Sequence, residues 1–585
     1  MVEIIICWAY IALVCSIVGA GINHLAQKNK NIPSFKNMTV VQCVITGVVT
    51  LTIYAEFFSI FYKVGIICHV IMLVAVLICG YFAKDYFVKM CRKLWQTVKS
   101  WEGIFYFLII LVTAYYTSRG QFHTDTGIYH AQAIRIIEEY GLIKGLANLQ
   151  LHFGYNSAYF SFCALFTGSG ILPSALHATT GFIEAVCLIY AFRNIKNYLR
   201  SSKIVVCSSI AIIVYAIVNI TGSMSPATDY VTLFMVLYVI TEWCIAATGN
   251  KNCNRQDNLN SYQQDTASID AYIMPAIMSV FIVSMKLSSG PIILLALYPL
   301  VILIKDRKWM KVLWSVVLSV ISVLPYLIRN VLVSGWLLYP FDKIDIFNVE
   351  WKVPVEYLRT DAAQIAVWGK TLYDVTKQDM PMSQWVPIWW SNQQHYDQML
   401  IYALILSVIF IICIMLGRLL RKERINLDVT TLYIAMFAVL ILWFVESPFV
   451  RYGIEMLIAA PLITVGLFWD AVCVKNADKV HGSFETYFGG TAVVLIVLCF
   501  AALLDNYVMD DLVFAKQYAG KSYYVMQQPF DDSETGTEEL NGNKVYYSVE
   551  GQINSYYSCP STCYKVMLDR SELMGNTIES GFKAK

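Results

Sequence analysis

Apolar runs recur along almost the whole sequence, and they limit the fold more than any other feature. Most of them are long enough to cross the roughly 30 Å hydrocarbon core of a bilayer as a helix. Since backbone polar groups inside lipid must satisfy one another, such runs form helices. The sequence therefore predicts an all-α polytopic membrane protein with about 14 transmembrane helices. The candidate spans lie near residues 3–21, 40–62, 64–83, 101–118, 172–192, 204–221, 229–247, 271–285, 288–304, 312–328, 399–416, 429–445, 453–469 and 488–504.

The composition agrees with a membrane protein. Charged residues make up 14% of the chain and apolar residues 57%, whereas soluble domains carry about 25% charged residues. The net charge is +2, and the basic residues lie in separate loops, so we expect no nucleic acid partner. The sixteen cysteines fall mostly inside apolar runs, where cysteine acts as a small hydrophobe. No cysteine and histidine spacing fits a metal site.

Lysine and arginine clusters set the expected orientation, because they favour the cytoplasmic side. If the spans alternate, every cluster falls on one side and both termini lie outside. The first span lacks a preceding positive charge and a cleavage site, so we expect it to be retained. The exterior then receives the long segments 119–156, 329–398 and 505–585, while 248–270 has the composition of a cytoplasmic linker. The clusters are Lys28, Lys30 and Lys36; Lys84, Lys89, Arg92, Lys93 and Lys99; Arg193, Lys196, Arg200 and Lys203; Lys305, Arg307, Lys308 and Lys311; and Arg418, Arg421, Lys422 and Arg424.

A polar segment, FHTDTGIYHAQ at 122–132, follows the apolar run 101–118. Its continuation TGIYHAQAIRIIEEYG has helical periodicity, with Thr124 or Asp125 as a plausible N-cap. At 100° per residue, Asp125, Gln132, Arg135 and Glu139 share one stripe, which we expect to face water or a cavity. His130 falls on the opposite, apolar side, whereas His123 is free to approach Asp125. Two interpretations of Asp125 stay open here: a helix cap or a functional carboxylate.

Other ionisable residues lie at the predicted outer ends of spans. Asp229 lies in SPATDY, Lys286 in SMKLSSGP, Arg329 in PYLIRN and Arg451 in ESPFVRYG. Charges at membrane depth cost a few kcal/mol unless they are paired or face a wet cavity, so they mark functional sites. Snorkelling to headgroups explains any one of them. Three cations and two carboxylates on one face instead predict a site for an anionic headgroup with a carboxylate left for proton transfer.

The two longest exterior segments should fold. The loop 329–398 is too long to be structureless, so it is expected to form a small cap. Its tryptophans suit an aromatic belt or stacking against sugar rings. The tail 505–585 shows strand-like alternation in KSYYVMQQ and NKVYYSVEG, and an exterior location allows a disulfide between Cys559 and Cys563. The expected organisation is three N-terminal spans in 1–100, a membrane core in 101–328, the cap loop 329–398, further spans in 399–504 and an exterior subdomain in 505–585.

An acidic residue in the first large exterior loop, an interfacial helix after it and roughly eleven further spans resemble the GT-C superfamily of membrane glycosyltransferases. The motif order is also similar to a group of uncharacterised bacterial polytopic membrane proteins. These motifs are HTDTGIYHAQAIRIIEEYG, LANLQLHFGYNS, SPATD, KLS, RNVLVSGWLLYP, VEWKVP and SPFVRYG. The resemblance begins near residue 101, which leaves the first three helices as an N-terminal addition. It implies an integral protein of a bacterial plasma membrane.

The GT-C resemblance implies a role for Asp125 as the general base that deprotonates the acceptor hydroxyl. The donor would be a sugar linked to a polyprenyl phosphate, and the acceptor a glycan or lipid. The departing phosphate is a stable anion, so one carboxylate suffices, unlike the pair that glycosidases use. From charge and depth we expect Lys286, Arg329 and Arg451 to hold the lipid phosphate and Asp229 to orient the acceptor or support the cations. His123, Gln132 and Arg135 complete the candidate substrate-binding residues.

Cofactors and other functions follow from the same residues. Some GT-C enzymes use a divalent metal, but the position of His130 disfavours one here. A transporter or flippase of lipid-linked glycans would use the same cations, yet it should also carry charges near the midplane and paired, broken halves. We find no internal repeat, which favours an enzyme. A polysaccharide polymerase is closer to the transferase and poorly separated from it, while a non-catalytic scaffold leaves the stripe through Asp125 unexplained.

Overall fold

The computed structural model describes residues 1–256, 261–420, 426–475, 484–517 and 523–585. Within these residues, 11 helices are long and apolar enough to cross a membrane, or 12 if the bent pair α3 and α4 forms one span. The multi-pass helical class is therefore confirmed, with fewer qualifying helices than the predicted 14. The long elements are α1 (Val2–Gln27), α2 (Val40–Phe61), α3 (Ile66–Phe82), α4 (Lys84–Val98), α5 (Trp101–Arg119), α9 (Thr179–Tyr198), α10 (Lys203–Asn219), α11 (Thr228–Gln256), α12 (Ser261–Met285), η4 (Leu287–Ala296), α13 (Leu297–Lys305), α14 (Trp309–Ser334), α17 (His395–Leu420), α18 (Leu427–Glu446), α19 (Ile454–Lys475) and α20 (Phe484–Gln517).

Several predicted boundaries differ from the observed ones. The span predicted at 172–192 begins only at Thr179, because Pro173 lacks an N–H and restricts the residue before it. The segment 248–270, expected to be a linker, is largely taken up by α11 and α12, with 257–260 outside the described residues. Once a helix is nucleated, each added residue costs little, so polar residues can extend it past the membrane. For the same reason α20 continues to Gln517, beyond the predicted end at 504.

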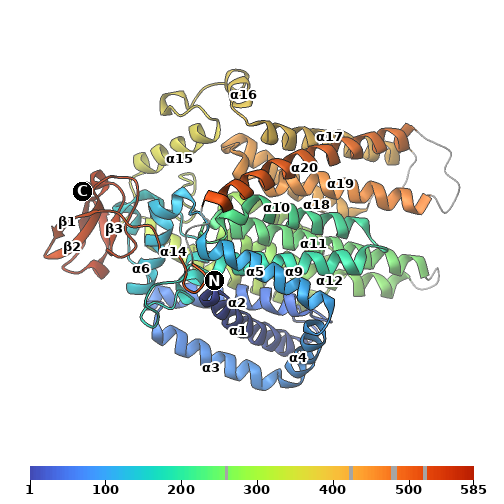
Figure 1. Ribbon diagram of the computed structural model, residues 1–585, viewed down its shortest axis with the longest axis horizontal. Helices are drawn as coiled ribbons and strands as arrows, with labels where there is room; N and C mark the ends of the chain where they lie inside the picture. Colours follow the sequence, from blue (N-terminus) through green and yellow to red (C-terminus); the bar gives the residue numbers. More distant parts are fainter. Residues whose placement is uncertain (257–260, 421–425, 476–483, 518–522) are drawn as a thin grey trace.

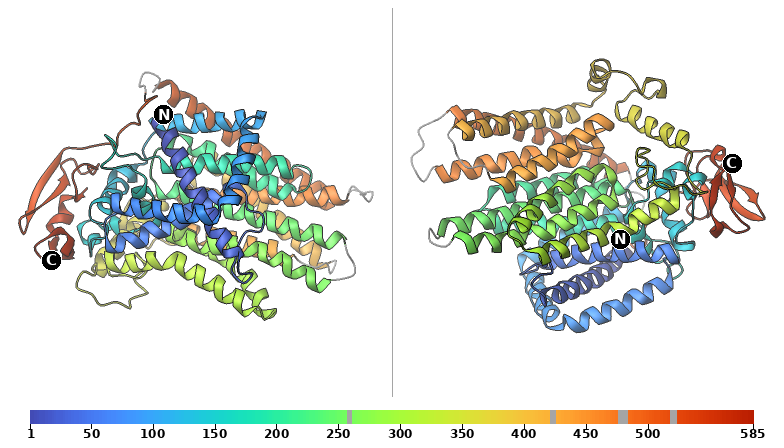
Figure 2. Two further views of the ribbon diagram at one scale, coloured as in Figure 1. Left: turned by 90° about the horizontal axis from the view of Figure 1, so that it is seen from below. Right: turned by 180° about the vertical axis from the view of Figure 1, so that it is seen from behind.

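The long helices lie side by side in one bundle, and the smaller elements gather at one of its ends (Figures 1 and 2). That end carries α6 (Ala131–Glu139), α7 (Leu146–Leu149), α8 (Ala158–Leu165), α15 (Val355–Gly369) and the C-terminal strands. Both chain termini lie there as well. The Met1 ammonium donates to Ser118 Oγ at 2.7 Å, and the Phe582 N–H donates to Lys144 O at 2.9 Å. We call this the loop end; that it faces the exterior stays a prediction.

The C-terminal subdomain is a small mixed structure. β1 (Thr535–Leu540) pairs antiparallel with β2 (Asn543–Ser548), and β3 (Ser561–Thr562) runs parallel to β2. A second pair joins β4 (Ser571–Leu573) to β5 (Phe582–Ala584), after the short helix α21 (Lys565–Asp569). The strand expected in NKVYYSVEG is therefore present. The described part of KSYYVMQQ is not a strand. Its backbone instead forms hydrogen bonds with the start of α1 and the end of α5.

The two tail cysteines do not form the expected disulfide. Cys559 and Cys563 are free thiols, one half-buried and one buried.

Among the cap elements, α15 is followed by η5 (Val375–Lys377) and α16 (Met382–Ser391), so the loop 329–398 does contain helices of its own.

The first helices are built into the bundle and are not an addition to it. The Trp8 indole of α1 donates to Ala178 O at 2.7 Å, just before α9. From α2, the Gln42 side chain donates to the Glu242 carboxylate of α11 at 2.9 Å. Both contacts are buried or half-buried links between elements distant in sequence. The resemblance that began near residue 101 therefore marked no structural boundary.

A buried charge pair also ties α2 to α14. Arg329 donates to Asn156 Oδ1 at 3.0 Å and to the Ser59 hydroxyl. Glu56 is fully buried on α2 and has Arg329 as its countercharge. Among the described residues no hydrogen-bond donor reaches the Glu56 carboxylate oxygens. A direct polar contact between the two helices is therefore the hydrogen bond from Arg329 to Ser59, and the charge of Arg329 acts on Glu56 without a hydrogen bond.

Removing one member of this pair should be far worse than removing both. We expect Arg329→Met to lower the free energy of unfolding by about 3–5 kcal/mol, because it removes the cation beside the buried Glu56 together with the hydrogen bonds of Arg329 to Asn156 and Ser59. The double variant Glu56→Gln/Arg329→Met should recover most of that loss. Thermal unfolding of the detergent-purified protein measures both. Arg359→Met, which removes the exposed partner of Asp342, serves as the control and should change stability by less than about 1 kcal/mol. Equal loss in the single and double variants would contradict this assignment.

Candidate functional site

Five of the predicted site residues converge at the loop end of the bundle, from four separate segments. His123 and Asp125 lie between α5 and the π-helical turn η1 (Thr126–His130). Asp229 lies in the first turn of α11, and Lys286 directly follows α12. Arg451 lies in the short η6 (Val450–Tyr452) before α19. We call these five residues the charged cluster. All of them sit at helix ends, where backbone groups lack partners inside the helix.

Arg451 is the centre of the charged cluster. Its Nη2 donates to Asp125 Oδ2 at 3.2 Å and to the Tyr452 hydroxyl at 3.1 Å. Its Nη1 contacts His123 Nε2, and its Nε lies 3.9 Å from Asp229 Oδ2. Burial works against the guanidinium charge, but Tyr452 and the two carboxylates outweigh it and keep the pKa of Arg451 above its usual value. The arginine therefore stays charged and joins three segments.

Lys286 forms the second ion pair of the cluster. Its Nζ lies 2.7 Å from Asp229 Oδ1 and 4.7 Å from the centroid of the Tyr452 ring. Both side chains are mostly buried, at 16% and 14% exposed. The fully buried Glu455, in the first turn of α19, adds a third carboxyl group, near enough for the charge of Lys286 to act on it. Asp229 and Glu455 both lie at helix N-termini, where the helix dipole favours negative charge.

His123 positions Arg451 and Asp125 while staying neutral. Burial, followed by the charge of Arg451, lowers the pKa of His123. Because a guanidinium can only donate, His123 Nε2 is the acceptor toward Arg451. On the other side of the ring, the Asp125 backbone N–H lies 3.1 Å from Nδ1, and Asp125 Oδ2 lies 3.5 Å from the same nitrogen. The Asp125 side chain is 31% exposed, so its carboxylate is held from one side and open to solvent on the other.

The π-turn explains why Asp125 does not lie on the polar stripe expected along the following helix. In η1 the Ala131 N–H bonds to Thr126 O, five residues back, so the turn wraps one residue more than an α-helix does. Asp125 occupies the N-cap position but makes no side-chain capping bond. Its carboxylate points to Arg451 instead. The interpretation of Asp125 as merely a cap does not fit these contacts.

Three predicted residues lie outside the charged cluster. The fully buried Gln132 donates to Ser558 O at 3.0 Å, in the C-terminal subdomain. Arg135 pairs with Glu139 at 2.7 Å. Arg329 is sealed between α2 and α14, as described above. Of the polar stripe expected along α6, Gln132 is therefore covered by the tail subdomain, whereas Glu139 lines a cavity.

The tryptophans of the cap mostly hold the cap together. Trp336 and Trp389 are buried, and their indoles donate to Val353 O at 3.0 Å and Pro448 O at 2.8 Å. Trp385 is also buried, whereas Trp368 is 59% exposed. Burial removes Trp336, Trp385 and Trp389 from any sugar-stacking role, whereas the Trp368 ring is accessible.

Sequence reasoning missed several residues that contact the charged cluster. Glu455 follows Arg451 by four residues at the start of an apolar run, so the rule applied to the other membrane charges would have found it. Tyr452 and Tyr129 give no such signal, because tyrosine is common at membrane boundaries. The fully buried Glu242 carboxylate also lies well inside α11, so the expectation that ionisable residues gather at one face is incomplete.

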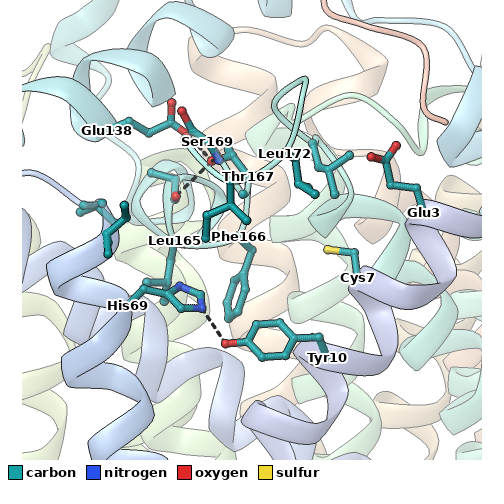
Figure 3. Close-up of a pocket in the computed structure, with 18 of the residues that line it drawn as sticks. Glu3, Cys7, Tyr10, His69, Glu138, Leu165, Phe166, Thr167, Ser169 and Leu172 are labelled. Atoms are coloured by element: carbon teal, nitrogen blue, oxygen red, sulfur yellow. Dashed lines mark hydrogen bonds between the residues drawn. The ribbon is translucent and has the colours of Figure 1, made fainter.

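Metal and pocket geometry add two facts. Across the described ranges, no group of three His, Cys, Asp or Glu side chains is arranged to hold a metal ion. A cavity of about 820 Å³ lies between α1, the start of α3 and the segment after α8 (Figure 3). None of its lining residues belongs to the charged cluster. The two features are separate sites.

The fold and the cluster together define a multi-pass membrane protein whose polar site lies at one end of its helical bundle. The chain belongs to a family described as a domain of unknown function (DUF8201), whose model matches residues 1–458. That match includes the first helices and the whole charged cluster. No curated protein and no solved structure is significantly similar to the chain.

The buried histidine next to the cluster predicts a pH-dependent stability. Burial lowers the pKa of His130 to about 3, so the folded state disfavours its protonation while the unfolded chain takes the proton near pH 6.5. Stability from this group is complete above pH 6.5 and falls as the pH drops, by about 2 kcal/mol between pH 6.5 and 5. Thermal unfolding of wild type and His130→Gln across this range measures the difference.

The comparison isolates His130 because Gln can keep the contact with Thr126 Oγ1, which is 3.3 Å from His130 Nδ1. Burial raises the pKa of Glu138 to about 7, which gives the opposite pH slope, but this contribution is the same in both proteins. Parallel pH curves for wild type and the variant would show that His130 does not carry the effect.

Proposed function

We propose that the protein is a membrane glycosyltransferase of the GT-C type. It would move a sugar from a polyprenyl-phosphate-linked donor to a glycan or lipid acceptor at the outer face of a bacterial plasma membrane. The observation that carries the proposal is the charged cluster. It brings one half-exposed carboxylate, Asp125, next to two cations, Arg451 and Lys286, at a single end of the bundle.

The cations are suited to a lipid phosphate. Arg451 is 36% exposed and presents a planar fork of donors, a geometry that matches phosphate oxygens. The N-termini of α11 and α19 lie beside it and add backbone N–H groups that favour an anion. Membrane-embedded helices approach the same end, so a polyprenyl chain can stay in lipid while its phosphate reaches the cluster.

Asp125 is suited to act as the general base. The acceptor hydroxyl oxygen would attack the anomeric carbon, and its proton would pass to the Asp125 carboxylate. The bond from that carbon to the phosphate oxygen would break, with the electron pair leaving on the phosphate. Base assistance of this kind supplies roughly 10²–10⁴-fold.

Donor binding would also prepare the base. In the structure Asp125 and Arg451 are joined by a partly exposed ion pair, and such pairs contribute only about 0–1 kcal/mol. The phosphodiester of the donor carries one negative charge, as a carboxylate does, and its two free oxygens match the fork of the same guanidinium. Its arrival would release the Asp125 carboxylate toward the acceptor, while the Asp125 backbone N–H stays bonded to His123 Nδ1.

The Asp125→Asn variant tests the proposal. We expect cells that carry it to lack the same surface or lipid-linked sugar as cells with the gene deleted, because the amide cannot accept the proton. Glycan profiling measures this, with matched membrane levels of the protein. Asp374→Asn is the control, since Asp374, like Asp125, is the N-cap residue of a short helical turn but lies exposed in the cap.

Two other outcomes would count against a transferase. Glycans like those of wild type in the Asp125→Asn cells would remove the catalytic role. Accumulation of intact lipid-linked glycan on the inner face would instead favour a carrier. Glu242, a buried carboxylate inside α11, is a feature that suits a carrier, but it is already hydrogen-bonded to Gln42 and Tyr190.

A further inference from the structure

The cavity of about 820 Å³ lies apart from the charged cluster, and the end of α6 and the tail residues Val525 and Met526 form part of its wall. α1 contributes Cys7 and Tyr10, and the start of α3 contributes Ile66 and His69. The segment after α8 closes the cavity, with Leu172 reaching over it (Figure 3). Its volume is in the range of ligand pockets, about 300–1,000 Å³. The inference that follows does not rest on the proposed transferase.

The interior of this cavity offers few free polar groups. The Tyr10 hydroxyl and His69 Nε2 bond to each other at 2.6 Å. The Glu138 carboxylate accepts from the Tyr556 hydroxyl at 2.7 Å and from Thr167. Most other lining side chains are apolar. Water is poorly held in such a space, whereas a hydrocarbon chain would restore the missing dispersion contacts.

The mouth of the cavity opens toward lipid. Lining residues around it expose large apolar side chains: Ile6 is 65% exposed, Ile66 60% and Ile171 73%. Ile6 and Ile66 belong to the first turns of α1 and α3, so the opening lies near the loop end of the bundle, at one leaflet. In a membrane this surface contacts the acyl chains of that leaflet.

The rim carries charges of both signs. Glu3 presents a carboxylate, Glu139 a second one that is also paired with Arg135 at 2.7 Å, and Lys63 an exposed ammonium. A headgroup with an ammonium and a phosphate would match this rim, whereas a purely anionic headgroup would meet two carboxylates. We propose that the cavity binds an acyl chain of an aminophospholipid, with the zwitterionic headgroup lying across Glu3, Glu139 and Lys63.

Native mass spectrometry of the full-length, delipidated protein tests this inference. The probes are phosphatidylethanolamine, phosphatidylglycerol and a C55 polyprenyl phosphate, each added separately. We expect phosphatidylethanolamine to bind most tightly. Cys7→Trp should weaken its binding by about tenfold or more, a loss of at least about 1.4 kcal/mol, because the indole fills the cavity.

The matched control is Leu13→Trp, which lies 49% exposed on the same helix and outside the cavity lining. It should bind lipid like wild type. If Cys7→Trp does not elute as a single folded species, Leu172→Trp provides the same test from the opposite wall. Lys63→Glu should weaken the binding of phosphatidylethanolamine, because it removes the ammonium that faces the lipid phosphate, and should weaken the binding of phosphatidylglycerol at least as much.

Two results would overturn the proposal. One is equal retention of phosphatidylethanolamine by the cavity-filling variants and by Leu13→Trp. The other is tighter binding of phosphatidylglycerol or of the polyprenyl phosphate to wild type, which would make the cavity a site for an anionic lipid. A failure of the Asp125→Asn experiment changes neither reading, since the cavity and the charged cluster share no residue.

Discussion

The guanidinium of Arg451 is the interaction on which the site depends. It contacts His123 and Asp125, more than 300 residues earlier in the chain, and approaches Asp229 at the start of α11. The guanidinium carries a permanent positive charge in a partly buried environment. This charge makes it favourable for carboxylates from separate helix ends to come together. Without it, Asp125 and Asp229 would repel each other, and the short η6 before α19 would lose its contacts with His123, Asp125 and Asp229.

The bilayer explains why the chemistry is confined to these ends. Inside lipid the backbone must satisfy itself, so helices leave no free main-chain groups except in their first and last turns. Each member of the charged cluster belongs to such a turn. The π-turn after Asp125 extends this principle, because its extra residue rotates Asp125 away from α6 and toward Arg451. Turns of this type are frequent at functional sites.

The N-terminal helices serve two purposes in the same fold. Through Gln42 and the pair formed by Glu56 and Arg329, they are fastened to the central helices by buried polar contacts. Through α1 and α3 they also enclose the lipid-facing cavity beside α8. These contacts join α1 and α2 directly to α11, α14 and the segment before α9. The family match from residue 1 agrees with this organisation.

The sequence by itself determined the membrane class, the helices and the helix-end positions of Asp125, Asp229, Lys286 and Arg451. These follow from local hydrophobicity, which acts over twenty residues or so. Only the tertiary structure decided what each polar side chain faces. Gln132 looked like a cavity residue until the tail subdomain, more than 400 residues later, covered it. Helical periodicity assigns a side chain to a face, but the partner of that face comes from packing between distant segments.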